Sequence, residues 1–210
     1  MSKPALSHSA DNSKAQLLHA GKVLFSANGL NGTTVRDLAQ LAGVNICMIS
    51  YHFEGKEGLY RACIEEFGKS RVQNMKGLLH KPESAQDFKV RLKLLISFLV
   101  TNIAEEPELH KMLVREMEAG LPIARDVFEK SFLVMFNDMI SFFKSAQKAH
   151  FIRADMDPFF LSMTIYANVG HMLRTQGLCT HYFNRSIQDP KEREKMIDSL
   201  LALIIHGTSL

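Results

Sequence analysis

The sequence predicts an all-α protein in which an N-terminal helix-turn-helix domain is followed by a larger helical domain. Apolar residues recur three to four positions apart in one segment after another, which is the periodicity of a helix that buries one face. Glycine and proline separate these segments, at places where helices end or begin. The alternating pattern of a half-buried strand does not occur, and the chain contains neither an internal repeat nor a low-complexity tract.

The first expected helix spans residues 14–28. Residues 1–12 are polar and rich in serine, which predicts a flexible arm, and Asn12 or Ser13 then caps the helix. Its inner face carries Leu17, Gly21, Leu24 and Phe25. Two Asn-Gly pairs, at 28–29 and 31–32, predict the turns that lead to the next helix.

Residues 33–53 predict two short helices joined by a tight turn. Thr33 or Thr34 can cap the first helix, and Asp37 favours the positive end of its dipole. Gly43 ends this helix because glycine tolerates the left-handed conformation, and Asn45 caps the second helix. Two helices in this arrangement form a helix-turn-helix.

The second of these helices has an unusual outer face. Ile49 and Phe53 lie four residues apart and should pack on the first helix, so the outward residues are Ile46, Cys47, Met48, Ser50, Tyr51 and His52. An outward Met, Tyr and His suit base edges, thymine methyl groups and phosphates better than a plain solvated face. A third helix opens at 54–57, where N-terminal amides and Lys56 predict a phosphate site. The expected core of this small domain is Leu17, Leu24, Phe25, Val35, Leu38, Val44, Ile49 and Phe53.

At these residues the chain resembles the TetR-type transcriptional regulators. That family carries a Thr-Val-x-x-Leu/Ile-Ala-x-x-Ala-Gly-Val turn, a Tyr-His-Phe ending and then Lys-Glu-x-Leu. The corresponding residues here are Thr34-Val35, Leu38-Ala39, Ala42-Gly43-Val44, Tyr51-His52-Phe53 and Lys56-Glu57-Gly58-Leu59. Beyond Leu59 only the length and the helical pattern agree with the family.

The resemblance implies a DNA-binding domain over residues 1–57 and a helical effector-binding and dimerisation domain over 58–210. We expect phosphate contacts from Thr33, Thr34, Tyr51, His52 and Lys56. We expect base contacts from Ile46 and Met48, together with Cys47 and Ser50, and Asn45 stands at the start of the same surface. The alternative is that Tyr51 and His52 serve in capping or packing, and that the two helices form a core without binding DNA.

Helical segments are expected throughout the second domain. A long helix over 56–80 ends before Pro82, Ser84 caps the next, and Pro107 starts another over 108–118. Gly120 and Pro122 precede a helix over 123–149 that is rich in Phe and Met. A further helix covers 158–176, residues 177–189 are expected to form a loop, and Pro190 begins the last helix.

The Phe- and Met-rich middle of the chain is the expected effector site. Such residues at helical spacing usually form only a core, but adaptable Met and aromatic side chains also suit an apolar ligand pocket, and the resemblance implies that small molecules bind in this domain. With few charges in the lining, the ligand should be apolar or aromatic. The candidate residues are Phe98, Met117, Phe132, Met135, Phe136, Met139, Tyr166 and His171.

Composition narrows the function classes. The formal charge of +3 over 210 residues permits nucleic-acid binding without requiring it. The three cysteines imply no disulfide framework and fit a reducing cytoplasm, and no signal peptide or membrane span is expected. The spacing of His171, Cys179 and His181 matches no zinc pattern, so no metal is expected. We expect neither a cofactor nor enzymatic activity, since no catalytic signature occurs.

These observations predict a regulator that binds an inverted-repeat operator in double-stranded DNA and is released by a small-molecule effector, which makes it a repressor. It should act as a homodimer through the last two helices, because residues 158–176 and 191–206 carry more apolar surface than one small domain needs. Two alternatives remain: a helical bundle that binds a ligand or metal, and a DNA-binding protein without sequence preference.

Overall fold

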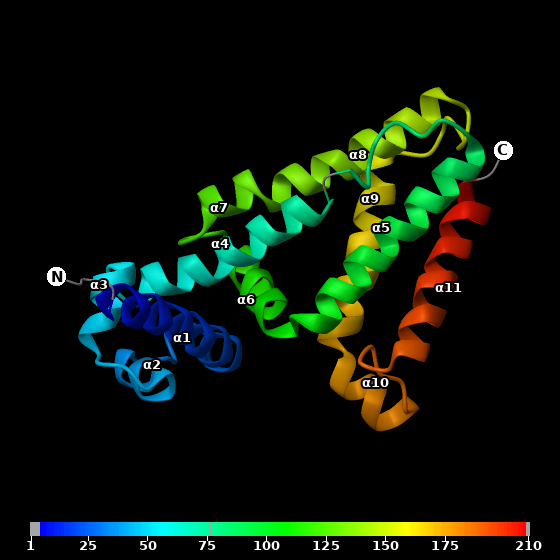
Figure 1. The fold of residues 1–210 in the computed structure, drawn as a ribbon. Coiled ribbons are helices and arrows are strands. Elements are labelled where there is room, and N and C mark those ends of the chain that lie inside the picture. The colour runs from blue at the N-terminus through cyan, green and yellow to red at the C-terminus, as the bar shows by residue number, and fades with distance from the viewer. Residues whose placement is uncertain (1–4, 76, 209–210) are drawn as a thin grey trace. The chain divides into compact units, whose positions relative to one another are not determined.

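The computed structural model describes residues 5–75 and 77–208, and this part of the chain contains helices and no strand. The prediction of an all-α fold is therefore confirmed. The helices are α1 (Ala5–Asn28), α2 (Val35–Ala42), α3 (Cys47–Phe53), α4 (Lys56–Met75), α5 (Ala85–Glu105), α6 (Pro107–Glu118), α7 (Arg125–Lys130), α8 (Phe132–Lys148), α9 (Pro158–Arg174), α10 (Gln176–Phe183) and α11 (Pro190–Thr208) (Figure 1).

The chain divides into two compact units. The first unit contains the chain up to Ser70 together with Glu108–Ser131, and the second contains Arg71–Pro107 together with the chain from Phe132 onward. Helices α6 and α7 therefore belong to the same unit as the helix-turn-helix. The expected functional boundary between residues 57 and 58 stays a prediction.

The core of the first unit lies where α1 meets α2 and α3. Leu17 and Phe25 of α1, Leu38 of α2, and Ile49 and Phe53 of α3 are buried, as the sequence predicted. Leu24 and Val44 are half-buried. The expectation for Val35 was wrong, because this residue is the first of α2, lies one turn before the buried stripe of that helix and is 37% exposed.

Helix α6 is attached to this unit by polar contacts. Arg115 Nη1 donates hydrogen bonds to the carbonyl oxygens of Phe25 and Ser26 at the end of α1. Glu116 is buried, and its Oε1 accepts from the backbone N–H groups of Ile123 and Ala124, at 2.7 and 2.8 Å. These bonds fix both the end of α1 and the turn that precedes α7.

The core of the second unit is formed by α5, α8, α9 and α11. Helix α5 packs against both α9 and α11, and α8 packs against α9 (Figure 1). Phe88 of α5 stacks on Phe142 of α8 with ring centroids 5.4 Å apart. Arg71, near the end of α4, is buried and donates to Asn102 of α5 and to Glu106, the residue that follows α5.

Several predicted helix boundaries were wrong. Helix α1 begins at Ala5 rather than 14, so residues 5–12 are helical instead of a flexible arm, and residues 1–4 of that arm lie outside the described part. Helix α4 ends at Met75 rather than near 80, since Gly77 follows with a φ of 89°. The helix expected over 123–149 is interrupted at Ser131, whose φ and ψ of −127° and −73° separate α7 from α8.

The segment 177–189 was expected to be a loop, but residues 177–183 belong to α10. This helix has no charged residue at its start, no side-chain cap and no buried residue. The signals that mark a helix in a sequence, caps and an apolar stripe, are therefore missing. Asn184 ends it in the left-handed conformation, with a φ of 50°. Among the helices of residues 5–75 and 77–208, none is long and apolar enough to span a bilayer.

Candidate nucleic-acid interface

The position of α2 is set by caps at both ends. Thr34 Oγ1 accepts from the N–H of Asp37, and Asp37 Oδ2 accepts from the N–H of Thr34, both at 3.1 Å, which is a capping box. The Thr34 hydroxyl also lies 2.6 Å from Asp37 Oδ2, and its hydrogen bond to this oxygen, followed by that from the Thr34 N–H, holds the pKa of the Asp37 carboxyl below its usual value. Gly43 follows α2 with a φ of 66° and lets the chain turn directly toward α3.

Helix α3 turns most of the predicted contact residues outward. The side chain of Asn45 accepts from the N–H of Cys47 at 2.9 Å and so starts the helix. Ile49 and Phe53 anchor it to the core. On the opposite side Ile46, Cys47, Ser50 and Tyr51 are exposed, and Met48 and His52 are half-buried. This set of exposed and half-buried residues is the α3 face.

Thr33 and Lys56 hold the loop that precedes α2. Thr33 is buried, and its hydroxyl donates to the carbonyl oxygens of Leu24 and Gly29. Lys56 Nζ donates to the carbonyl oxygens of Leu30 and Thr33, at 2.8 and 2.9 Å. An ammonium group has three N–H donors, so these two bonds leave one N–H to reach an acceptor outside the loop. Phosphate contact by Thr33 and Lys56 stays a prediction, and the role that the structure gives them is to shape the loop.

His52 is oriented by contacts on two sides. Its Nε2 lies 2.9 Å from Ser13 Oγ of α1, and its ring meets the ring of Tyr51 edge-on at 4.8 Å between centroids. A hollow of about 460 Å³ lies beside it, lined in part by Lys14, Glu54 and Arg61. Sequence reasoning did not single out Lys14 for this surface. Its place in the first helix, far along the chain from α3, gave no sign that it would lie near His52.

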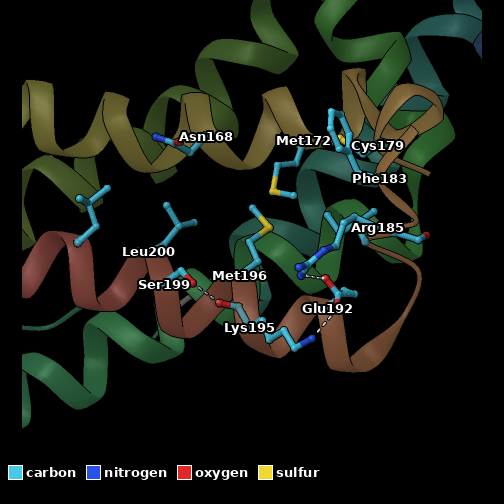
Figure 2. A pocket seen from close by; sticks show the side chains of 13 residues that line it. Asn168, Met172, Cys179, Phe183, Arg185, Glu192, Lys195, Met196, Ser199 and Leu200 are labelled. Carbon is cyan, nitrogen blue, oxygen red and sulfur yellow. Dashed lines mark hydrogen bonds and ion pairs between the residues drawn. The ribbon is translucent and has the colours of Figure 1, made fainter. Parts of the chain in front are cut away.

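The eight candidate effector residues are divided between the two units. Met117 is exposed and belongs to the first unit, and the other seven belong to the second. Phe132 and Met139 are buried in the core, Phe98, Met135, Phe136 and Tyr166 are half-buried, and His171 is exposed. The second unit also forms a groove of about 450 Å³ between α9, α10 and α11 (Figure 2), and none of the eight residues lines it. The assignment of the effector site to the eight residues stays a prediction.

The cysteines differ in reactivity. Cys63 is buried, and burial raises the pKa of its thiol to about 12, so it is protonated at neutral pH. Cys47 is exposed on the α3 face and Cys179 is half-buried in the groove; all three are free thiols. Within the described residues, no group of three or more His, Cys, Asp or Glu side chains could hold a metal ion.

Comparisons with known proteins agree on one class of protein, the transcriptional regulators. The family model of the bacterial regulatory proteins of the tetR family matches residues 17–63, which include α2 and α3. The HTH-type transcriptional regulator RutR of Escherichia coli (strain K12) is 25% identical over 200 residues, covering 92% of this chain and 89% of RutR. The HTH-type transcriptional dual regulator CecR of Shigella flexneri is 42% identical over 65 residues, 31% of this chain and 29% of CecR.

Solved structures show the same fold along nearly the whole chain. The ketosteroid transcriptional regulator KstR2 of Mycobacterium tuberculosis superposes with a TM-score of 0.74 at 18% identity, covering 94% of this chain and 95% of KstR2. The transcriptional regulator FadR from Bacillus subtilis, in complex with stearoyl-CoA, gives a TM-score of 0.70 at 18% identity, with 92% and 98% coverage.

Proposed function

We propose that this protein is a repressor and that it binds an inverted-repeat operator as a dimer. The proposal starts from its class: the chain belongs to the tetR family of bacterial regulatory proteins and is a DNA-binding transcriptional regulator. The observation that carries this proposal is the α3 face. It is supported by a helix-turn-helix whose first helix, α2, is capped at both ends, and which lies within the matched residues 17–63. The protein works as a regulator in the cytoplasm, where its operator lies, and not as an enzyme.

The α3 face divides between base and phosphate contacts. Ile46 and Met48, with Cys47 and Ser50 beside them, present apolar and weakly polar groups that fit thymine methyl groups and base edges in the major groove. Thr34, Tyr51 and His52 flank them with groups that bind phosphates, and Lys56 adds its remaining N–H. Phosphate contacts fix the register of α3 on the duplex, while the base contacts give sequence preference.

The proposal of a dimer rests on the shortness of the recognition helix α3 and on the apolar side chains exposed on α9 and α11. A seven-residue recognition helix reads few base pairs, and two-fold pairing on an inverted repeat doubles the contact. Phe160 and Met163 of α9 and Leu203 of α11 are 66%, 40% and 60% exposed. Large apolar groups exposed on two helices of one unit are typical of an interface between subunits. The dimer therefore forms through α9 and α11.

The repressor is released by a small apolar or aromatic molecule. FadR from Bacillus subtilis holds stearoyl-CoA, which shows that this fold accommodates a ligand with a long apolar part. An effector releases DNA only if it binds one conformation of the regulator better than the other. The recognition helices of a dimer must be about 34–36 Å apart to read one face of DNA, so a modest change in their separation lowers operator affinity.

Selection of bound sequences from random double-stranded DNA by the full chain tests the proposal. We expect one inverted repeat to be enriched, with binding that weakens as salt rises. Salt-sensitive binding without an enriched sequence would favour a DNA-packaging role instead. No binding at low salt would mean that the helix-turn-helix is only structural.

A further inference from the structure

The hollow beside His52 is formed by α1, the end of α3 and the start of α4. Its volume is about 460 Å³, and the residues that line it, and so define the His52 hollow, are Lys14, His52, Phe53, Glu54, Gly58, Arg61 and Ala62. His52 also belongs to the α3 face, so the hollow lies directly beside the proposed DNA-binding surface. The contacts that we propose for the α3 face use no residue of this lining except His52.

Two close contacts hold together the three elements that form the hollow. Ser13 of α1 is buried, and its hydroxyl oxygen lies 2.9 Å from His52 Nε2, so α1 is fastened to the end of α3. Gly58 of α4 lies so near the end of α3 that a Cβ atom on it would be 1.7 Å from the carbonyl oxygen of Phe53. Only glycine permits this approach. The backbone frame of the hollow is therefore fixed by the fold.

Lys14 is the cation of the hollow that is available to a ligand. It is exposed, and among the residues whose side chains the structure describes it makes neither an ion pair nor a hydrogen bond. Arg61, in contrast, is bonded to two carboxylates: its Nη2 lies 2.5 Å from Asp126 Oδ2, and its Nη1 lies 3.3 Å from Glu65 Oε2. Glu54 is the carboxylate of the lining, and it is exposed. The ammonium group of Lys14 thus faces solvent beside His52, with Glu54 as the opposing charge.

The position of the hollow along α3 points to the DNA backbone rather than to the bases. In a helix-turn-helix, the first residues of the recognition helix contact base edges. Residues 46–48 stand at that end of α3, whereas the hollow lies at its last residues, His52 and Phe53. The sugar-phosphate backbone borders the groove that the helix enters, so a cation beside the last turn meets a phosphate.

We propose that the His52 hollow receives a phosphate of the operator backbone, which is bound by the Lys14 ammonium group next to His52. Lysine binds phosphate as a point charge, through any of its three N–H donors. Helix α1 thereby adds a phosphate contact from outside the helix-turn-helix, and a dimer adds two. This inference rests on the proposed function, because the ligand is the DNA that α3 reads.

Glu54 favours a phosphate of bound DNA over a free anion as the occupant. Lys14 and Glu54 carry opposite charges and Arg61 is already paired, so the hollow by itself attracts an anion from solution only weakly. A duplex that is docked on the α3 face brings its own phosphate to the hollow at a high effective concentration. The contact then adds affinity and helps to fix the register of α3, and it gives no sequence preference.

The salt dependence of operator binding tests the proposal, with the sequence selected from random DNA as the operator. Each phosphate contact contributes about 0.9 to the slope of log K against log salt concentration, so Lys14→Ala should reduce the slope for a dimer by about 1.8. Binding should weaken about tenfold at low salt, with no change in the selected sequence. Lys111→Ala removes an exposed lysine of the same unit that does not line the hollow, and this matched control should bind as the wild type does. Circular dichroism checks that the helices of both variants are intact.

Phosphate ethylation interference locates the contact on the DNA. In each half-site, ethylation of one phosphate should inhibit the wild type and have no effect on Lys14→Ala. Replacement of that phosphate by an uncharged methylphosphonate should weaken the wild type about as much as Lys14→Ala does. It should weaken the variant no further, because both changes remove the same contact.

Three results would overturn the proposal: equal salt slopes for Lys14→Ala and the wild type, identical ethylation patterns for the two proteins, or additive effects of Lys14→Ala and the methylphosphonate. If inorganic phosphate at constant ionic strength displaced operator from the wild type and not from Lys14→Ala, the hollow would be a site for a free anion instead. A wild type that bound no DNA would contradict the proposed function and this inference together. A wild type that bound its operator with the same salt slope as the variant would contradict only the role of Lys14.

Discussion

Arg115 Nη1 lies 2.9 Å from the carbonyl oxygen of Ser26, so a residue of α6 caps the end of α1 from 89 positions away in the sequence. Helix α1 has no basic residue in its own last turn. A cation at this place satisfies carbonyl groups that the helix leaves unpaired and interacts favourably with its dipole. The capped helix is the one that carries α2 and α3, so α6 supports the proposed DNA-binding surface.

Arg115→Ala should therefore destabilise the first unit. We expect a loss of about 1 kcal/mol in the free energy of unfolding, because the hydrogen bonds to α1 are charge-assisted but solvent-accessible. Urea unfolding followed by circular dichroism measures it. Lys111→Ala, an exposed lysine on the same helix, is the control and should have little effect. Equal stability of the two variants would show that the cap contributes nothing.

Met48→Ala should change sequence preference at one or two base pairs rather than weaken all DNA binding. Its side chain belongs to the α3 face and not to the core formed by Ile49 and Phe53. Selection from random DNA with the variant measures the preference. Lys56→Ala is the contrasting change: it should weaken all sequences about equally and flatten the salt dependence. An unchanged selected sequence for Met48→Ala would mean that Met48 does not read bases.

These site assignments show what the sequence could and could not predict. The cap at Thr34, the turn at Gly43 and the outward α3 face depend on residues within a few positions of each other, and sequence reasoning found them. The hydroxyl of Thr33 bonds to the carbonyl oxygen of Leu24 across 9 positions, and Lys56 bonds to the loop across 23 and 26 positions. Nothing local in the sequence could show that both side chains are used inside the fold.

The sequence also gave no sign that α6 belongs to the same compact unit as the helix-turn-helix. Arg115 contacts Phe25 across 90 positions, and such a contact has no local signature in the sequence. The assignment of α6 to the second domain therefore rested on the resemblance. Helix α10 was missed for a different reason. It buries none of its residues, and the apolar periodicity by which helices are recognised reflects burial.

Stability should fall as the pH rises from about 10 to about 12. Burial, followed by the nearby Glu116 carboxylate, raises the pKa of Tyr60 to about 12 from its usual value of 10.0. Between these values the unfolded chain has lost the phenol proton while the folded chain keeps it, so the free energy of unfolding decreases with pH. Urea unfolding at pH 8 and pH 11 measures the decrease.

Tyr60→Phe should make the fall with pH shallower. The variant also loses the hydrogen bond from Tyr60 to the carbonyl oxygen of Met112, which costs about 1 kcal/mol at every pH. The buried thiol of Cys63 titrates in the same range, because its pKa is also raised to about 12, so both proteins are compared in a Cys63→Ala background. Identical pH profiles with and without the Tyr60 hydroxyl would rule out this origin of the pH dependence.

Phe160→Asp should convert the protein from a dimer to a monomer at micromolar concentration. Phe160 is 66% exposed on α9, and an aspartate at this place would have to be buried unpaired in an α9–α11 interface, which costs several kcal/mol. Light scattering without DNA measures the mass, and circular dichroism checks that the helices are intact. Val90→Asp introduces the same charge at an exposed apolar position on α5 and should leave the dimer unchanged. If both the wild type and Phe160→Asp were dimers, the interface would lie on another surface.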